Sequence, residues 1–407
     1  MEGLEFYKSG GKIRVMDKSL KSQIAYSFFY LGVFIEVMLV LIDKSAYTNP
    51  ILGQIFRLTF LLFLLKACLT KYSFKEYLLA AFFLLVGAAS YFITGRNEIV
   101  RIVVFLMACK DADMIKCLKF VFWMTLTGCL VIMALAVLGI FGTLSMTMDY
   151  GRGSIETRYV LGIGHPNALQ CMVCVLTMLG LYLYHDKCKW YSYLIVLGIN
   201  VVFFLLTDSK TGLLVAVCSV FLNALIPKIR NSKLVSFFLA GNIGIYAGSI
   251  FISIMAAKDA MCLWRHFTQG EYSSRIKFYV FLDKLLTGRI HALIETKNHE
   301  GVMETWSLFS SPDKNYYFDM GWVRLFYWYG IIPATLAVVA LTVFVIYFTK
   351  KKKLVELAFI SMFALYTVVE AHFISVYIAR NYLLFIIGMY WWQMEAIYER
   401  QSRNRDF

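Results

Sequence analysis

The stretch Leu234-VSFFLAGNIGIYAGSIFISIM-Ala256 is mainly apolar, carries no charged residue and is long enough to cross a bilayer as a helix. The chain changes character directly after it. Residues 257–319 contain no such stretch and instead gather cationic and polar side chains: Arg265, His266, Arg275, Arg289, His291, His299 and Asn315. A long polar segment between apolar ones is a typical place for binding residues, so we expect a polar or anionic substrate at the membrane surface.

The composition of the whole chain is typical of a membrane protein. Of 407 residues, 60% are hydrophobic and only 16% are charged. About twelve stretches approach the length of a spanning helix, about 20 residues; they lie near residues 25–41, 51–69, 77–93, 99–109, 120–141, 168–184, 191–206, 212–226, 234–256, 322–348, 354–373 and 381–396. The fourth is short and contains Arg101, so it can be tilted, re-entrant or paired with its neighbour. The sequence therefore predicts an all-α polytopic membrane protein.

Lysine and arginine in the short loops indicate the orientation. One set of loops, which includes the N-terminal segment, residues 350–353 and the C-terminal tail, is rich in both, and the alternate set holds few. Because cytoplasmic loops carry this excess, we predict a multi-pass cell-membrane protein with both termini cytoplasmic. Its segments are a cytoplasmic N-terminal segment (1–23), nine spans (24–256), a long extracellular loop with short helices (257–320), three spans (321–396) and a cytoplasmic tail (397–407). The net charge of +14 is then mostly topological, and no nucleic-acid partner is expected.

Two short outward segments carry the first candidate site residues. Residues 149–167 contain too much glycine and proline for a helix and end in His165-Pro-Asn167. Asn167 can either cap the helix that follows or contact a substrate. Arg158 and His165 lie at the same outer boundary without an evident structural role. In the next outward turn, Ser209 and Lys210 belong to a run of hydroxyls, Asp and Gly that is equally typical of a hairpin turn.

The long loop adds two arginines. A serine at 273 or 274 can begin a helix, whose apolar residues recur at helical spacing: Ile276, Tyr279, Val280 and Leu286. This pattern predicts a helix on the membrane surface, with Arg275 and Arg289 near its two ends. For either arginine alone, solvent or a lipid headgroup is the simpler partner.

The C-terminal third adds further polar residues on the same predicted side. Asn315 and Tyr316 precede an aromatic-rich span, Glu370 lies near the outer end of the next span, and Arg380-Asn381 opens the last one. Because a carboxylate in the bilayer costs a few kcal/mol, we expect Glu370 to be paired, with Arg380 as the plain candidate, or to line a wet cavity.

Cysteines are not predicted to form a functional site. Most of the nine lie in or beside apolar spans, and the C-x-x-C of Cys171 and Cys174 has no second pair. We expect these side chains to pack, and we expect neither a metal nor another cofactor.

The order of these motifs resembles the Wzy-type family, the polysaccharide repeat-unit polymerases of O-antigen and capsule pathways, which are relatives of O-antigen ligase. The series runs through GHPN (164–167), LTDSKTG (206–212), Ser274-Arg275, LTGR (286–289), Asn315-Tyr316, Glu370 and Asn381. The resemblance covers residues 158–381 and is carried by the ordered set, while the first third of the chain matches in hydropathy alone.

The resemblance implies a metal-independent glycosyltransferase on the outer face of the cytoplasmic membrane. Its donor would be a growing glycan on undecaprenyl diphosphate, its acceptor a single repeat on the same carrier, and a chain-length regulator and a flippase would act in the same pathway. The chain departs from the family in one turn, where relatives typically carry Ser-Arg and this chain has Ser209-Lys210. Lysine keeps the charge but loses the planar fork that binds diphosphate in a bidentate manner.

The chemistry of such a transfer suggests roles for these residues. A departing diphosphate needs cations, for which Arg158, Arg275 and Arg289 are the candidates. The acceptor hydroxyl needs a base, and the sequence leaves His165 and Glu370 open with a slight preference for Glu370. The remaining candidates are assigned to substrate binding: Asn167, Ser209, Lys210, Asn315, Tyr316, Arg380 and Asn381.

Two other functions fit part of the sequence. A flippase of the same lipid-linked glycan would use intramembrane charges such as Glu36 and Arg101, although the chain shows no internal repeat of two halves. A ligase of the same superfamily would transfer the finished glycan to another acceptor. A membrane scaffold without catalytic activity would leave the outward arginines unexplained.

Overall fold

The computed structural model describes residues 20–403 except 46, 150–154, 230, 271–272 and 296–299. Most of the basic N-terminal segment, the end of the tail and His299 therefore lie outside the described residues. Among the residues that are described, eight helices are long and apolar enough to cross a membrane. They are α1 (Leu20–Lys44), α3 (Phe74–Thr94), α5 (Met114–Val137), α6 (Pro166–Tyr184), α7 (Trp190–Thr207), α8 (Lys210–Leu225), α9 (Ser232–Gln269) and α12 (Ile331–Lys350). The prediction of a mainly helical membrane protein is confirmed.

Six further described helices do not combine this length with an apolar sequence: α2 (Leu52–Cys68), α4 (Glu98–Ala108), α10 (Ser274–Leu285), α11 (Gly321–Tyr329), α13 (Leu354–Val369) and α14 (Tyr382–Arg403, apolar as far as Trp392). With 11 residues, α4 is only about 16 Å long and cannot cross a bilayer alone. Ser273 caps α10 by accepting a hydrogen bond from the Ile276 amide, as its sequence predicted.

The tenth predicted span, residues 322–348, is not one helix, which corrects the sequence prediction. It is broken at Gly330 into α11 and α12. Gly330 has a φ of 92°, and a Cβ there would lie 2.5 Å from the Phe309 Cα. The loop before α11 also accepts a hydrogen bond from the start of α12, since the Ile331 amide donates to the Ser307 carbonyl. The break therefore follows from a tertiary contact.

The boundaries of the long polar segment also differ from the prediction. The helix α9 continues to Gln269, well past Ala256. The apolar residues Ile276 and Tyr279 of α10 are buried, and the Tyr279 hydroxyl donates to the Met255 carbonyl of α9. The predicted lipid-facing side of α10 is thus a contact with protein.

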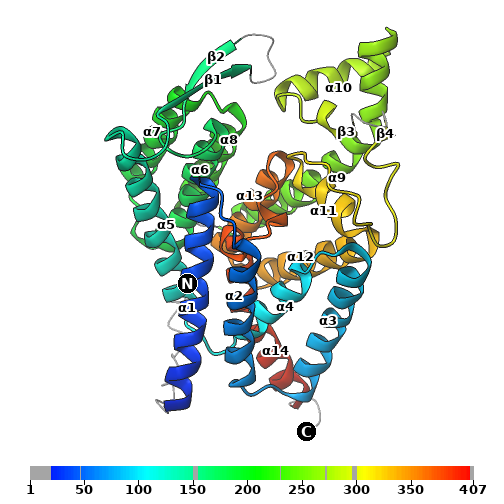
Figure 1. Ribbon diagram of the computed structural model, residues 1–407. Coiled ribbons are helices and arrows are strands. Elements are labelled where there is room, and N and C mark those ends of the chain that lie inside the picture. The colour runs from blue at the N-terminus through cyan, green and yellow to red at the C-terminus, as the bar shows by residue number, and fades with distance from the viewer. Residues whose placement is uncertain are drawn as a thin grey trace.

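Four short strands qualify the all-α prediction. β1 (Ser145–Asp149) pairs antiparallel with β2 (Ile155–Tyr159), and β3 (Ile294–Glu295) pairs with β4 (Glu300–Gly301). β2 lies within residues 149–167, which were predicted to be non-helical, whereas β1 begins before that region, at Ser145. In Figure 1, β1, β2 and α10 lie at one end of the molecule, while α1 begins and α14 ends at the opposite end.

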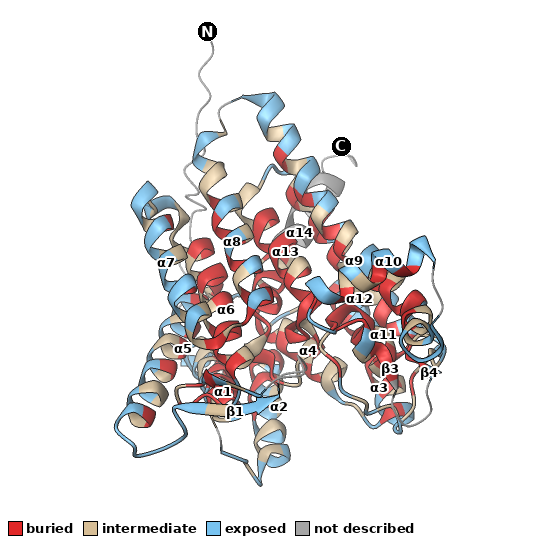
Figure 2. Ribbon diagram, turned by 90° about the horizontal axis from the view of Figure 1, so that it is seen from above, coloured by how far each residue is buried: buried red, intermediate tan, exposed pale blue. Residues whose placement is uncertain are grey.

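The centre of the fold is the packing of α13 against α9, α8 and α6. Figure 2 shows buried residues concentrated on α13 and α6, whereas α7 is largely exposed at the edge. Exposed apolar residues on outer helices, such as Phe92, Leu205 and Phe237, are expected where lipid is the solvent.

A buried ion pair fixes the segment that follows α13. Arg101 Nη2 lies 2.9 Å from Glu36 Oε1, and both side chains are almost fully enclosed. Glu36 Oε2 accepts from the Ile378 amide, and Arg101 Nη1 donates to the Val376 carbonyl. The two charges compensate each other and bond to backbone, although Arg101 Nε has no hydrogen-bond partner, so they tie Val376 and Ile378 to α4 and α1.

Candidate active site

Glu370 lies at the centre of a buried polar cluster. It directly follows α13 and is only 7% exposed. Its Oε1 accepts a hydrogen bond of 2.5 Å from Asn167 Nδ2 and one of 3.1 Å from Arg289 Nη2. The cluster thereby joins α13, the start of α6 and the turn after α10. Glu370 is paired, as its burial required, but with Arg289 and not with Arg380.

Arg289 is held by four hydrogen bonds to defined partners. Besides Glu370, Nε donates to the Val369 carbonyl at 2.7 Å, and Nη1 donates to the Leu286 carbonyl and to Thr287 Oγ1. A guanidinium has five N–H groups. The remaining Nη2 N–H has Asp319 Oδ2 at 3.7 Å, which is within ion-pair distance but too long for a hydrogen bond. This is the position at which an anionic ligand can engage Arg289.

The start of α6 explains how Asn167 reaches Glu370. His165 is the N-cap, since its Nδ1 accepts from the Asn167 amide, and Pro166 occupies the first helical position. Of the two roles left open for Asn167, helix capping is therefore excluded. The Asn167 side chain bridges two partners instead, because its Oδ1 accepts a 2.6 Å hydrogen bond from Ser209 Oγ.

His165 and Ser209 flank this bridge. His165 is partly covered by protein, and the resulting desolvation lowers the pKa of its imidazole below the ordinary value, which favours the neutral, proton-accepting form. Ser209 precedes α8, whose Gly212 permits close contact with α6: a Cβ there would lie 2.6 Å from Gln170 Cγ.

Asp319 is a member of the site that the sequence assignment missed. It lies just before α11, and its Oδ2 is 3.7 Å from Arg289 Nη2. Burial, followed by the nearby Glu370 carboxylate, raises the pKa of Asp319 to about 6. Gly321 lets this segment approach, since a Cβ there would lie 2.8 Å from the Glu370 carbonyl oxygen. The sequence did contain a signal for Asp319: a carboxylate directly before an apolar helix, on the same predicted side as the candidate cations.

Arg158 and Arg275 are neutralised elsewhere. Arg158 lies on β2 between Glu156 Oε2, at 2.5 Å, and Asp208 Oδ2, at 3.4 Å. Arg275 forms a bidentate contact with the buried Asp259 of α9. Neither contacts Glu370, although Arg158 lies near enough to His165 to lower its pKa. Their predicted role as diphosphate cations stays a prediction. The sequence assigned no partner to any of the three acids.

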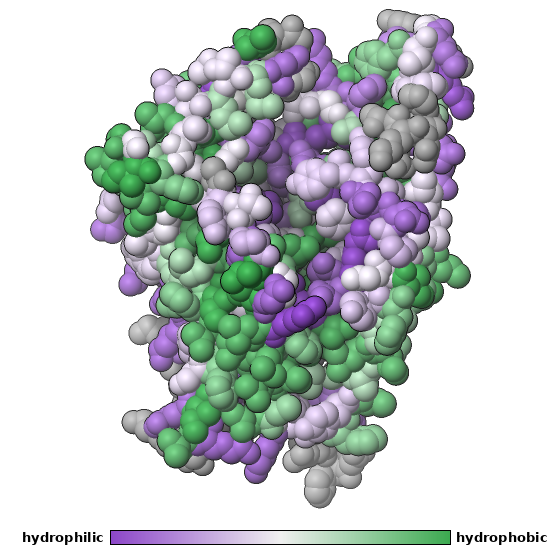
Figure 3. Space-filling model, viewed as in Figure 1, coloured by the Kyte–Doolittle hydropathy of each residue, from purple (hydrophilic) through white to green (hydrophobic). Residues whose placement is uncertain are grey.

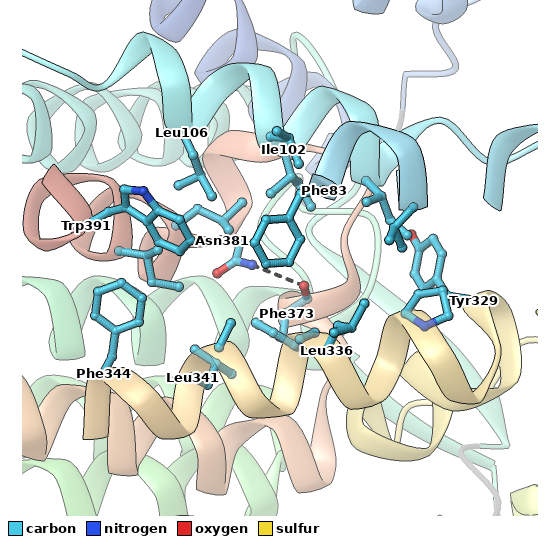
Figure 4. Close-up of a pocket in the computed structure, with 18 of the residues that line it drawn as sticks. Phe83, Ile102, Leu106, Tyr329, Leu336, Leu341, Phe344, Phe373, Asn381 and Trp391 are labelled. Atoms are coloured by element: carbon cyan, nitrogen blue, oxygen red, sulfur yellow. Dashed lines mark hydrogen bonds between the residues drawn. The ribbon is translucent and has the colours of Figure 1, made fainter. Parts of the chain in front are cut away.

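Arg380 and Asn381 lie in the segment that leads into α14. Arg380 Nη1 is 3.9 Å from Asp43 Oδ2. Asn381 is buried, and its Nδ2 donates to the Phe373 carbonyl at 3.1 Å (Figure 4). It borders an apolar cavity of about 180 Å³ between α3, α4, α12 and α14, lined by side chains such as Phe83, Leu106, Leu336 and Trp391 (Figure 4).

The last three predicted residues lie at the surface of the same half of the molecule. Lys210 is exposed in the first turn of α8, and Asn315 is exposed in the loop before α11. Tyr316 is half-buried, with its ring 6.0 Å from that of Phe318. Figure 3 shows hydrophilic side chains in a hollow in the upper half of the molecule, between the β1–β2 side and the α10 side, whereas the lower half is mainly hydrophobic.

One group of residues offers a possible ligand set for a metal. Ligand atoms of Cys171, Glu370 and His372 lie within 4.8 Å of one another, and all three residues are buried. Glu370 is already compensated by Arg289, and His372 Nε2 lies 3.2 Å from the Tyr366 hydroxyl. We therefore interpret these three side chains as hydrogen-bonding groups and not as metal ligands. All nine cysteines are free thiols in the structure.

Comparison with known proteins adds no assignment. No family model matches the chain, and neither a curated protein nor a solved structure is significantly similar to it.

Proposed function

We propose that this protein polymerises oligosaccharide repeat units carried on undecaprenyl diphosphate, as a metal-independent glycosyltransferase on the outer face of the cytoplasmic membrane. The observation that carries the proposal is the contact of Arg289 and Asn167 with the same oxygen of buried Glu370. Three segments far apart in sequence contribute to one polar cluster inside an otherwise apolar helical protein. All three, at Gly164–Asn167, Leu286–Arg289 and Glu370, belong to the ordered series that resembles the Wzy-type family.

The proposed reaction is a single displacement. The acceptor hydroxyl oxygen bonds to the anomeric carbon of the donor glycan, and the bond from that carbon to the diphosphate oxygen breaks. The electron pair leaves with the diphosphate, and the hydroxyl proton passes to a base. No redox partner is required.

The geometry supports a division of labour in this reaction. The free position at Arg289 Nη2 suits an oxygen of the departing diphosphate, which would replace Asp319 as the counter-charge. His165, whose pKa is lowered, is the proposed proton acceptor; because a neutral imidazole has one lone pair, its Nδ1 must first release the Asn167 amide. Glu370 then acts as a positioning residue, since it already accepts from both Arg289 and Asn167.

The topology belongs to the same proposal. The lysine-rich ends of the helices would lie in the cytoplasm with both termini, and the half of the molecule that carries β1, β2 and α10 would face outward. The apolar cavity beside Asn381 matches the hydrocarbon of a lipid carrier in chemistry.

Transport of the same glycan is the weaker alternative. A transport pathway would need charges that a substrate can reach, and Glu36 and Arg101 are buried in contact with each other. A ligase would share the cluster and differ in its acceptor alone.

A complementation experiment tests the proposal in cells. In a strain lacking this protein, wild-type chain should restore long glycans, whereas Glu370→Gln and Arg289→Lys should leave single repeats on the carrier. Lys284→Gln, on an exposed side of α10, is the control that should restore long glycans. All variants must be present in the membrane at equal amounts. Normal chain lengths in the deleted strain, or full elongation by both site variants, would contradict the proposal.

A further inference from the structure

Arg324 of α11 is a buried cation without an acidic partner among the described residues. It is 3% exposed, and no carboxylate of the described chain lies within 4.0 Å of it. Its Nε and Nη2 have no hydrogen-bond partner. Such a group is costly to bury, because an unsatisfied charged donor loses its hydration without replacement.

Aromatic rings surround this guanidinium. Its Cζ lies 3.9 Å from the centroid of the Tyr317 ring and 4.8 Å from that of Trp328. Cation–π contact offsets part of the cost of burial but leaves the N–H groups unpaired. The Tyr317 ring is 65% exposed, so on that side a single surface side chain covers the cation.

The unpaired groups around Arg324 include further donors. The indole Nε1 of Trp328 is buried without a partner, as is that of Trp306 in the adjoining loop. A second cation, Arg96, lies with its Cζ 5.3 Å from the Trp328 ring, and its hydrogen bonds to described residues all go to carbonyl oxygens, those of Ser311, Lys314 and Trp328. An excess of donors and positive charge matches an oxygen-rich anion.

We propose that Arg324 and Trp328, covered by Tyr317, form a second binding subsite that takes an anionic group of the substrate, a phosphate or a sugar carboxylate. This rests on the proposed function and names a chemistry for it. Arg324 and Arg289 both lie near enough to Asp319 to act on its charge, since each lowers the pKa that burial raises in this carboxyl. A substrate with one anion at Arg289 can therefore present another at Arg324.

The subsite explains why two cations are needed at one outer face. A transfer between two carrier-linked glycans brings two diphosphates, and an acidic repeat brings carboxylates. Pyrophosphate and glucuronate, used as separate probes, distinguish a phosphate ligand from a sugar carboxylate.

The test is direct binding to purified protein in lipid nanodiscs, measured by titration calorimetry without turnover. The probes are inorganic pyrophosphate, glucuronate and, as the neutral control, glucose. Arg324→Gln should weaken binding of the preferred anion about tenfold or more, since hydrogen bonds to charged groups contribute about 1.5–3 kcal/mol. The anion affinity of Arg324→Lys should lie between that of wild type and that of Arg324→Gln. Lys284→Gln, the matched loss of one positive charge, should bind like wild type.

Trp328→Phe keeps an aromatic ring but removes the pyrrole part of the indole with its N–H, so it tests the subsite if Arg324→Gln folds poorly; weaker anion binding is expected. A stronger effect on pyrophosphate indicates a phosphate ligand, and a stronger effect on glucuronate a sugar carboxylate. Equal binding by wild type, Arg324→Gln and Trp328→Phe, or no anion binding by wild type, overturns the subsite. The polymerase proposal is judged separately by chain elongation, so the two can fail independently.

Discussion

Removal of Arg289 should expose how strongly the central cluster depends on charge compensation. The substitution Arg289→Met leaves Glu370 buried, with Asn167 as its remaining partner in the cluster. Breaking a buried ion pair from one side typically costs about 3–5 kcal/mol, because the other charge stays desolvated. We expect a destabilisation in that range.

The double variant separates charge from the other contacts. Arg289 also donates to the Val369 and Leu286 carbonyls, and these bonds are lost in both the single and the double variant. Adding Glu370→Gln removes the uncompensated charge, so the double variant should be more stable than Arg289→Met alone. A coupling energy of about 2 kcal/mol is expected for partners in one hydrogen-bond network.

The assay is reversible unfolding in mixed micelles, followed by far-UV circular dichroism, for wild type, the two single variants and the double variant. Arg275→Met with Asp259→Asn is the matched control cycle. Because Arg275 is largely exposed, its coupling should be clearly smaller. The double site variant should regain stability but not polymerisation.

Additive effects at Arg289 and Glu370 would refute this reasoning. So would a coupling no larger than that of the control pair. Either result would mean that the two side chains do not depend on each other in the folded protein.

Three further predictions concern the segments around the cluster. Since the pKa of Asp319 is raised from 3.8 to about 6 in the folded protein, the folded state binds the extra proton and stability should fall as pH rises from about 4 to about 6; Asp319→Asn should flatten this dependence in unfolding curves. Gly321→Ala should displace the Glu370 backbone and reduce chain elongation, whereas Gly241→Ala, with open space around its Cβ, should not. Gly330→Ala should lower the unfolding temperature, with a cost of about 1–3 kcal/mol from backbone strain alone.

The apolar stretches of the sequence predicted where the membrane helices lie but not where these helices are interrupted. Each predicted span contains a helix, and the serine cap of α10 followed from local chemistry. The break at Gly330 could not be read from hydropathy, because its cause is the approach of Phe309 from a loop. The extension of α9 to Gln269 was missed because polar residues end a span without ending a helix.

The candidate site was predictable where residues act as a buried set. Glu370, Arg289, Asn167 and Ser209 were all named from the sequence, and the structure brings them together. Arg158 and Arg275 were assigned to the substrate because cations are conspicuous, while the carboxylates that neutralise them were read as ordinary loop residues.

Three side chains near the site received no role from the sequence. Asp319 and Arg324 depend on the packing of α11, and His372 lies beside Tyr366 only because residues 370–381 fold back into the protein. Pairing in three dimensions decides which charges are available to a ligand, and one sequence does not contain that information.

The most direct test of the central claim is a reaction of purified protein with one defined undecaprenyl-diphosphate-linked repeat, resolved by product length. The account predicts a ladder of products that increase by one repeat, formed without added metal and lost in Glu370→Gln. A wild-type protein that is folded and binds the substrate but yields only the single repeat would contradict it.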